Sequence, residues 1–161
     1  MSELLGNKIP ENILSIISPD ADKRINAAVF LITTDRDYFP RAAMLSPYQI
    51  CSVSDEEFLF SVYGGSNTTS NLKANGMSLF IFQDGGGVTY IRCRSEEDSV
   101  HKIMNPNAKE ILFTASDLSV TRDFSEKAKI TSITLFDESS VMDSYQRTFS
   151  QIMEIAKRWK D

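Results

Sequence analysis

Residues 58–82, with the sequence FLFSVYGGSNTTSNLKANGMSLFIF, constrain the fold of this chain more than any other segment. Two apolar runs of strand length flank a middle rich in glycine, hydroxyl and amide groups, and residues 72–75 have the composition of a short helix. A donor-rich turn that opens a helix suits an anion such as phosphate, because free backbone N–H groups and the positive end of the helix dipole lie there. On spacing alone, an ordinary polar loop between a strand and a helix is an equal alternative.

Apolar runs elsewhere in the chain predict a mainly β domain. Five further segments have strand character: residues 27–34, 41–46, 88–94, 111–115 and 129–136. The first of them is apolar almost throughout, which is typical of a central strand buried on both faces. A turn at residues 35–40 separates it from the second, so we expect these two segments to pair antiparallel. The glycine-rich residues 83–87 predict another tight connection, since glycine tolerates positive φ.

Helical patterns stand at both ends of the chain. Residues 10–17 begin with a proline and place isoleucines on one face, and residues 137–161 carry an apolar stripe at steps of three and four. A third, short helix is expected at residues 95–104, with Ser95 as its N-cap and acidic residues in its first turn. Together these patterns predict one domain, residues 1–161, of the α+β class: a mainly antiparallel β-barrel of six to seven strands with flanking N- and C-terminal helices.

Composition and charge argue against several classes of function. A net charge of -5 and a sequence pI near 4.9 disfavour binding to nucleic acid or to an anionic membrane, which relies on a basic surface. No stretch is long and apolar enough to span a bilayer, and the N-terminus lacks a signal-peptide pattern, so we expect a cytoplasmic protein. Cys51 and Cys93 are expected as free buried thiols, with a disulfide as the alternative. Because His101 is the single histidine, a multi-histidine metal site is excluded, and we expect no metal ligands in this chain.

One basic residue stands where it could complete an anion site. If residues 41–46 lie beside residues 58–62, the Arg41 guanidinium can reach an anion held by Ser66, Thr68 and the local N–H groups. Arginine is the natural bidentate partner of phosphate. A surface arginine that follows a turn proline is the alternative reading of this residue.

Three segments in this order carry a resemblance to a known family: LITTDRDYFPRAAML, EEFLFSVYGGSNTTSNLKANGMSLFIF and GGGVTYIRCR. The set is similar to the FMN-binding split β-barrel proteins related to pyridoxamine 5′-phosphate oxidase, and the similarity covers residues 5–94. The resemblance implies FMN at a homodimer interface. Its phosphate would lie on the loop of residues 66–71 and on Arg41, and its ring edge against the backbone of residues 42–45. The residues that it assigns to the cofactor are Arg41, Ala42, Ala43, Met44, Leu45, Ser66, Asn67, Thr68, Asn71 and Leu72.

Departures from the family pattern bear on the reaction. Asn67 and Thr68 stand where the oxidases carry an arginine–lysine pair, and the C-terminal segment lacks their basic, histidine- and arginine-containing substrate motif. The resemblance therefore implies an FMN-dependent oxidoreductase that acts on an unknown small molecule rather than on vitamin B6, and no residue stands out as its acid or base. The alternative is a non-catalytic flavin- or haem-binding module, such as a stress-related sensor or a cofactor carrier. In that case His101 is a candidate haem ligand, although a surface position is the simpler reading.

Overall fold

A computed structural model describes residues 2–21, 27–84, 86–106, 109–127, 130, 134–135, 137 and 139–159. The strands are β1 (Ser2–Gly6), β2 (Val29–Thr34), β3 (Pro40–Leu45), β4 (Ile50–Ser52), β5 (Phe58–Tyr63), β6 (Met77–Gln83), β7 (Gly87–Glu97) and β8 (Glu110–Phe124). The helices are α1 (Glu11–Ile17), α2 (Asn67–Asn75), α3 (Met142–Arg158) and the 3₁₀ helix η1 (Pro47–Gln49).

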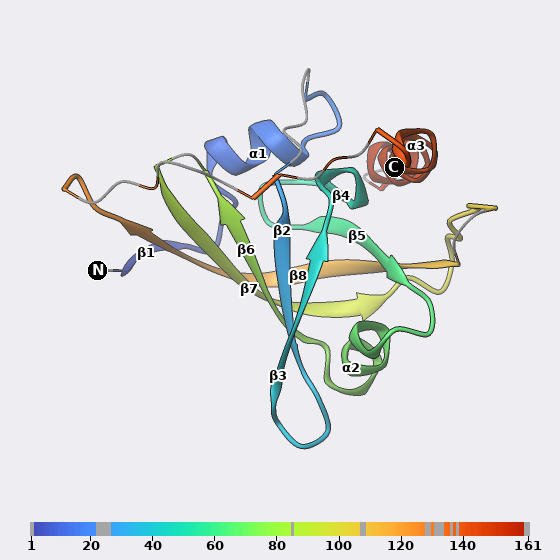
Figure 1. Cartoon of the computed structure of the whole chain (residues 1–161), viewed down its shortest axis with the longest axis horizontal. Helices are drawn as coiled ribbons and strands as arrows, with labels where there is room; N and C mark the ends of the chain where they lie inside the picture. Colours follow the sequence, from blue (N-terminus) through green and yellow to red (C-terminus); the bar gives the residue numbers. More distant parts are fainter. Residues whose placement is uncertain are drawn as a thin grey trace.

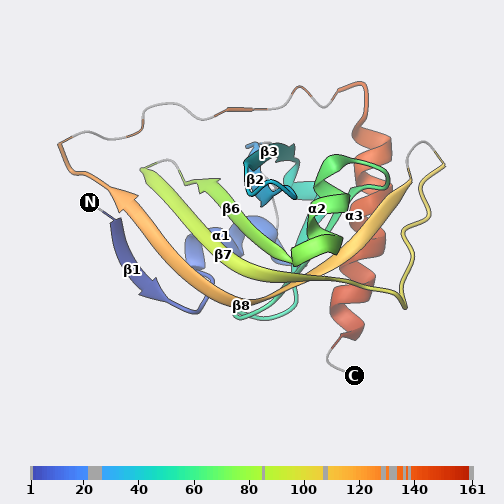
Figure 2. The ribbon, with the colours of Figure 1, turned by 90° about the horizontal axis from the view of Figure 1, so that it is seen from below.

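The strands form one curled antiparallel sheet in the order β3-β2-β6-β7-β8-β5-β4, and β1 adds to β8 beside this path (Figure 1). The long strands β7 and β8 curve around the molecule, and α3 runs across one end of it (Figure 2). The predicted antiparallel split barrel with terminal helices is confirmed. Its sheet has eight strands because β1 and β4 add to the expected set, whereas the segment predicted at residues 129–136 lies mostly outside the described residues.

Strand β5 is buried on both of its faces, which explains why its sequence is apolar almost throughout. Phe58, Phe60 and Val62 point into the main core, where Phe60 meets Phe80 edge-on with ring centroids 4.9 Å apart. Leu59 points to the opposite side and belongs to a second apolar cluster under α3. Both faces of β5 are therefore buried, which a period-2 alternation of apolar and polar residues could not provide.

Helix α3 supplies the cover for that second cluster. Ile152 and Ala156 are buried against Leu59, Leu112 and the neighbouring apolar side chains, as the predicted stripe requires. The helix is shorter than residues 137–161, since it begins at Met142 and ends at Arg158.

The helix predicted at residues 95–104 is wrong. Its first three residues continue β7, where Ser95 pairs with Ala115 and donates its backbone N–H to the carbonyl of Gly76 at 2.7 Å. The Ser95 side chain is buried, so it does not serve as an N-cap. Asp98 instead closes a turn, because its carboxylate accepts the N–H groups of Val100 and His101 at 2.8 and 3.0 Å.

Both cysteines are buried free thiols, as predicted. Burial raises the pKa of Cys93 to about 11, although its interactions with Ser78 and Ser95 act in the opposite direction. In the part of the chain that the structure describes, no helix is long and apolar enough to cross a membrane.

A bidentate ion pair between Arg122 and Asp84 joins β8 to the connection between β6 and β7. Arg122 donates from Nε and Nη2 to the Asp84 carboxylate at 2.9 and 3.0 Å, and the Asp84 side chain is only 2% exposed. The same carboxylate accepts the Gly87 N–H at 2.8 Å and the Thr89 hydroxyl at 3.1 Å. Burial by itself raises the pKa of Asp84, but the donors outweigh it and lower the pKa to about 2.

We expect the stability contributed by Asp84 to disappear in acid. Its folded pKa lies below the unfolded value of 3.8, so the contribution is complete above pH 4 and is lost as the pH falls toward 2. Denaturant unfolding from pH 6 to pH 2 should therefore show that the deficit of Asp84→Asn relative to wild type shrinks with acidification. Asp37→Asn, at an exposed turn position, serves as the control and should run parallel to wild type. A deficit that stays constant down to pH 2 would contradict the assignment.

Candidate functional site

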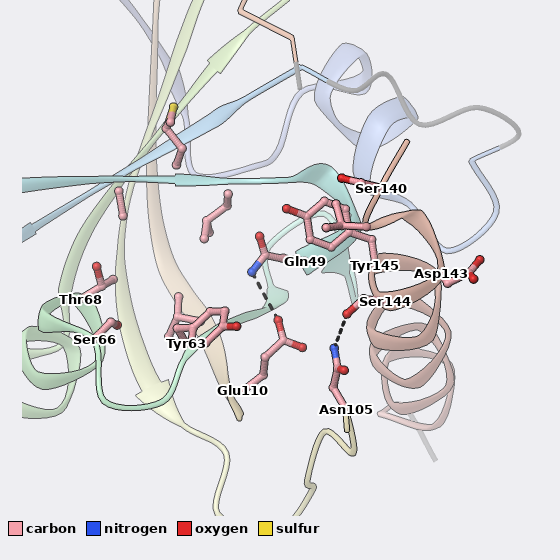
Figure 3. A pocket seen from close by; sticks show the side chains of 15 residues that line it. Gln49, Tyr63, Ser66, Thr68, Asn105, Glu110, Ser140, Asp143, Ser144 and Tyr145 are labelled. Carbon is pink, nitrogen blue, oxygen red and sulfur yellow. Dashed lines mark hydrogen bonds between the residues drawn. The ribbon is translucent and has the colours of Figure 1, made fainter. Parts of the chain in front are cut away.

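The described residues enclose a cavity of about 700 Å³ between the end of β3, the start of α2 and the start of α3 (Figure 3). It lies where β5 leaves the sheet, at the end of the strand that separates the two apolar clusters. Its lining residues are Ala43, Met44, Leu45, Gln49, Val62, Tyr63, Ser66, Thr68, Asn105, Glu110, Ser140, Val141, Asp143, Ser144 and Tyr145. The size lies within the range of small-molecule sites.

The start of α2 offers backbone donors to this cavity. Ser66 is the N-cap, and its hydroxyl accepts the N–H of Thr69 at 3.1 Å. Thr69 in turn donates its hydroxyl to the carbonyl of Tyr63 at 2.6 Å, which ties the helix start to the end of β5. Among the described residues, the N–H groups of Asn67 and Thr68 and the Thr68 hydroxyl have no hydrogen-bond acceptor. These groups form the donor set that the sequence predicted.

Strand β3 offers a second row of backbone groups, because it is the last strand of the sheet path. In an antiparallel pair, hydrogen-bonded and non-hydrogen-bonded residue pairs alternate along the strands. The Asp35 N–H donates to the Phe39 carbonyl at 3.0 Å, so Asp35 and Phe39 are a hydrogen-bonded pair and every second pair from there along β2 and β3 is one as well. By that alternation, the backbone N–H and C=O groups of Ala42 and Met44 face away from β2, toward the edge of β3 that no other described strand covers. Met44 and its neighbours Ala43 and Leu45 line the cavity, so this edge borders it.

Five of the ten residues assigned to a cofactor by resemblance meet at the cavity. These are Ala43, Met44, Leu45, Ser66 and Thr68. Ala42 and Asn67 are exposed neighbours of this group in the chain. Asn71 and Leu72 lie on the inner side of α2, where Leu72 joins the main core.

Arg41 stands two residues beyond the cavity lining and is held by its own turn. Its Nε donates to the Asp35 carboxylate at 3.0 Å, and its side chain is 62% exposed. The pKa of Asp35 is lowered by this hydrogen bond from Arg41. Arg41 shares a face of the hairpin with Ala43, since Thr33 and Leu31 are their respective partners on β2. The structure thus places Arg41 next to the cavity, in an ion pair.

A group of polar side chains that the sequence did not predict converges on Glu110, the first residue of β8. Its Oε1 accepts from the Ser61 hydroxyl at 3.3 Å and from Gln49 Nε2 at 3.5 Å, and its Oε2 accepts from the Thr148 hydroxyl at 2.5 Å. Asn105 donates to Thr148 at 3.1 Å and thereby completes the chain of hydrogen bonds. Figure 3 shows the Gln49 amide and the Glu110 carboxylate pointing toward each other.

Two sequence signals could have pointed to this network. Ser61 interrupts the apolar run FLFSV, and Thr148 stands between Tyr145 and Ile152 on the apolar stripe of α3. A buried hydroxyl in such a position requires a partner. The partner itself could not be predicted, because Glu110 belongs to another strand.

Aromatic rings fix the start of α3 against η1. Tyr48 stacks on Tyr145 with centroids 6.4 Å apart and meets Phe149 edge-on at 5.9 Å. Tyr145 therefore both lines the cavity and anchors the helix that closes one of its sides.

The charged residues of the described lining are both acidic, Glu110 and Asp143. Lys73, on α2, points elsewhere and pairs with Glu97 at 3.0 Å. The described residues contain no cluster of three or more His, Cys, Asp or Glu side chains able to hold a metal ion.

His101 lies outside the cavity lining. Its Nδ1 is 2.7 Å from the Asp98 carboxylate, and its ring lies 5.9 Å from that of Trp159 near the end of α3. Its side chain is 41% exposed, which agrees with the surface position that the sequence suggested.

Comparisons with known proteins place this geometry in a known fold. No family model matches the chain, and a search of curated proteins finds no significant match. A candidate pyridoxamine 5′-phosphate oxidase of Lactobacillus delbrueckii superposes with a TM-score of 0.58 and 14% identity, over 74% of this chain and 98% of that one. A histidine-to-alanine variant of HupZ from Group A Streptococcus superposes with a TM-score of 0.53 and 11% identity, over 71% and 99%. The chain has the split β-barrel fold of proteins related to pyridoxamine 5′-phosphate oxidase.

The position of α2 depends on a buried hydrogen bond, which yields a prediction. Asn71 donates to the Thr33 hydroxyl at 3.0 Å, and both side chains are buried. Asn71→Ala leaves that hydroxyl without its partner, so we expect a loss of about 1–3 kcal/mol in unfolding free energy. Denaturant unfolding would measure it, with the exposed Asn67→Ala as the matched control on the same helix. Equal stability of the two variants would show that this bond does not hold α2.

Proposed function

We propose that the cavity binds FMN and that the protein is a flavin-dependent oxidoreductase that acts on a small molecule. One observation carries the proposal: the N–H groups at the start of α2 and the free peptide edge of β3 border the same cavity. Two such rows suit a ligand that has an anionic group at one end and a planar hydrogen-bonding edge at the other. The name of the similar structure from Lactobacillus delbrueckii is consistent with such a ligand.

The residues present fit the parts of FMN unequally. The phosphate would be held by the N–H groups of Asn67 and Thr68 and by the Thr68 hydroxyl, and the ring edge by the backbone of Ala42 and Met44. The described lining contains no cation, so neutral donors act alone unless Arg41 leaves Asp35. Because arginine and lysine add a charge–charge attraction to phosphate that neutral donors lack, FMN should bind more weakly here than on an arginine–lysine loop.

Bound flavin supplies the electron-transfer chemistry, and the chain supplies binding, orientation and a wall against water. Leu45, Val62 and the rings of Tyr63 and Tyr145 provide the apolar part of that wall. Of the two acidic side chains, Glu110 accepts a hydrogen bond from Thr148 of α3, whereas Asp143 points away from the cavity (Figure 3).

A homodimer is part of the proposal, and the outer face of the sheet supports it. Strand pairing places apolar side chains side by side in two rows across β3, β2, β6 and β7 on this face. The rows are Met44–Phe30–Ile81–Tyr90 and Ala42–Ile32–Leu79. Most of these side chains are half-buried, and Met44 is 57% exposed at the border of the cavity. A contiguous apolar face of this kind is suited to a protein partner, and a second copy would cover the free edge of β3.

A flavin-binding module without turnover is the second candidate. It is favoured by the described lining, whose acid–base side chains are carboxyl and phenol groups, with no histidine, cysteine or lysine among them. The geometry gives less support to haem, since His101 faces Asp98 and Trp159 outside the cavity. Oxidation of NADH or NADPH by the FMN-loaded protein, with turnover to an acceptor, would decide for the oxidoreductase.

The phosphate subsite is tested with a pair of ligands that differ only in the phosphate. Thr68→Val removes one donor to a charged group, so we expect FMN to bind roughly ten- to hundredfold more weakly while riboflavin binding stays unchanged. Quenching of flavin fluorescence during titration measures both affinities. Ser70→Ala, on the exposed side of α2, is the control and should bind both flavins as wild type does.

Two results would count against this assignment. If wild type does not take up FMN at all, the proposed function fails. If Thr68→Val weakens FMN and riboflavin equally, the phosphate is bound somewhere else.

Dimerisation is tested at the centre of the apolar face. Leu79→Lys places a charge between Ile32 and Arg92, so we expect the variant to be monomeric and to lose FMN affinity together with the dimer. Sedimentation velocity at micromolar concentration measures the state. Leu4→Lys, at an exposed position on β1, is the matched control. A wild-type monomer, or a variant that still dimerises, would overturn this part of the proposal.

A further inference from the structure

Glu110 is oriented by more hydrogen bonds than any other acidic side chain of the cavity lining in the described chain. Its donors come from three different elements: Gln49 on η1, Ser61 on β5 and Thr148 on α3. These donors are themselves 8%, 0% and 1% exposed, so they are fixed by the packing around them. Buried polar groups are costly unless all are satisfied, and here their hydrogen bonds converge on one carboxylate.

The carboxylate retains capacity to accept a further donor. Two carboxylate oxygens offer about four acceptor sites. The described donors fill three of them, two on Oε1 and one on Oε2. Because Glu110 also lines the cavity, the remaining site on Oε2 is available to a ligand there.

The polarity of the cavity is uneven from end to end. Neutral donors stand at the start of α2, whereas Glu110 brings a negative charge that no lysine or arginine of the described lining balances. A carboxylate held in a partly desolvated site attracts a cation and repels an anion more strongly than it would in water.

We propose that Glu110 is a substrate-recognition residue and that it binds a cationic nitrogen group, such as a protonated amine, of the molecule that enters beside the flavin. The idea that this molecule is a substrate rests on the proposed function, but the charge preference of the pocket does not. The selected class is a small amine with an apolar body, since the rings of Tyr63 and Tyr145 line the same cavity as the carboxylate.

The test uses three probes that share one ring and differ in charge: benzylammonium, benzyl alcohol and benzoate at pH 7. Calorimetric titration is carried out on the apoprotein and on the FMN-loaded protein. We expect benzylammonium to bind about tenfold or more tightly than benzyl alcohol, and benzoate to bind most weakly. Glu110→Gln should remove this preference, whereas Glu154→Gln, at an exposed position of α3, should keep it.

The outcomes separate this inference from the proposed function. If the protein does not bind FMN but the apoprotein still prefers the amine, only the flavin assignment is contradicted. Equal binding of the three probes by wild type, or a preference that survives in Glu110→Gln, overturns the role of Glu110. If Glu110→Gln does not fold, nuclear Overhauser effects in wild type decide instead. They must join the benzylammonium methylene to the Glu110 side chain, and contacts elsewhere overturn the proposal.

Discussion

The burial of β5 on both faces is the constraint on which the rest of this structure depends. Its inward aromatic rings complete the barrel core, and its outward Leu59 needs cover of its own. Helix α3 provides that cover, so the C-terminal segment must cross the outside of the barrel. The place where β5 ends is then bounded by α3 on one side and by the start of α2 on the other. The cavity is a consequence of how the core is closed.

Much of the fold could be predicted because its signals are local. Apolar runs of strand length, the turn before β3 and the stripe of α3 each depend on residues close in sequence. The helix expected at residues 95–104 failed because acidic residues after a serine are a local cue, and a longer β7 ladder with a buried Ser95 overrode it. Strands β1 and β4 were missed because their five and three residues are too few for a periodic pattern.

The same distinction between local and long-range signals applies to the candidate site. Ser66 and Thr68 could be predicted, because the capping residue and the donors of a helix start are neighbours in the chain. The assignment of residues 42–45, which lie on β3, to the cofactor came from the family resemblance. Glu110 could not be placed, since its partners are separated from it by 38 to 61 positions and meet only in the folded chain. Tertiary polar networks are in general the part of a site that a single sequence reveals least.

The neutral character of the α2 start also has a kinetic consequence. A binding site built on lysine or arginine draws anions from a distance, and its association rate depends on the ionic strength. Here the donors are peptide N–H groups and a hydroxyl, on a protein of net charge -5. No local cation therefore draws an anion to the site, and the net negative charge of the protein repels it at a distance. Discrimination among anions must then come from shape and hydrogen-bond geometry, and added salt should raise the association rate because it screens the repulsion.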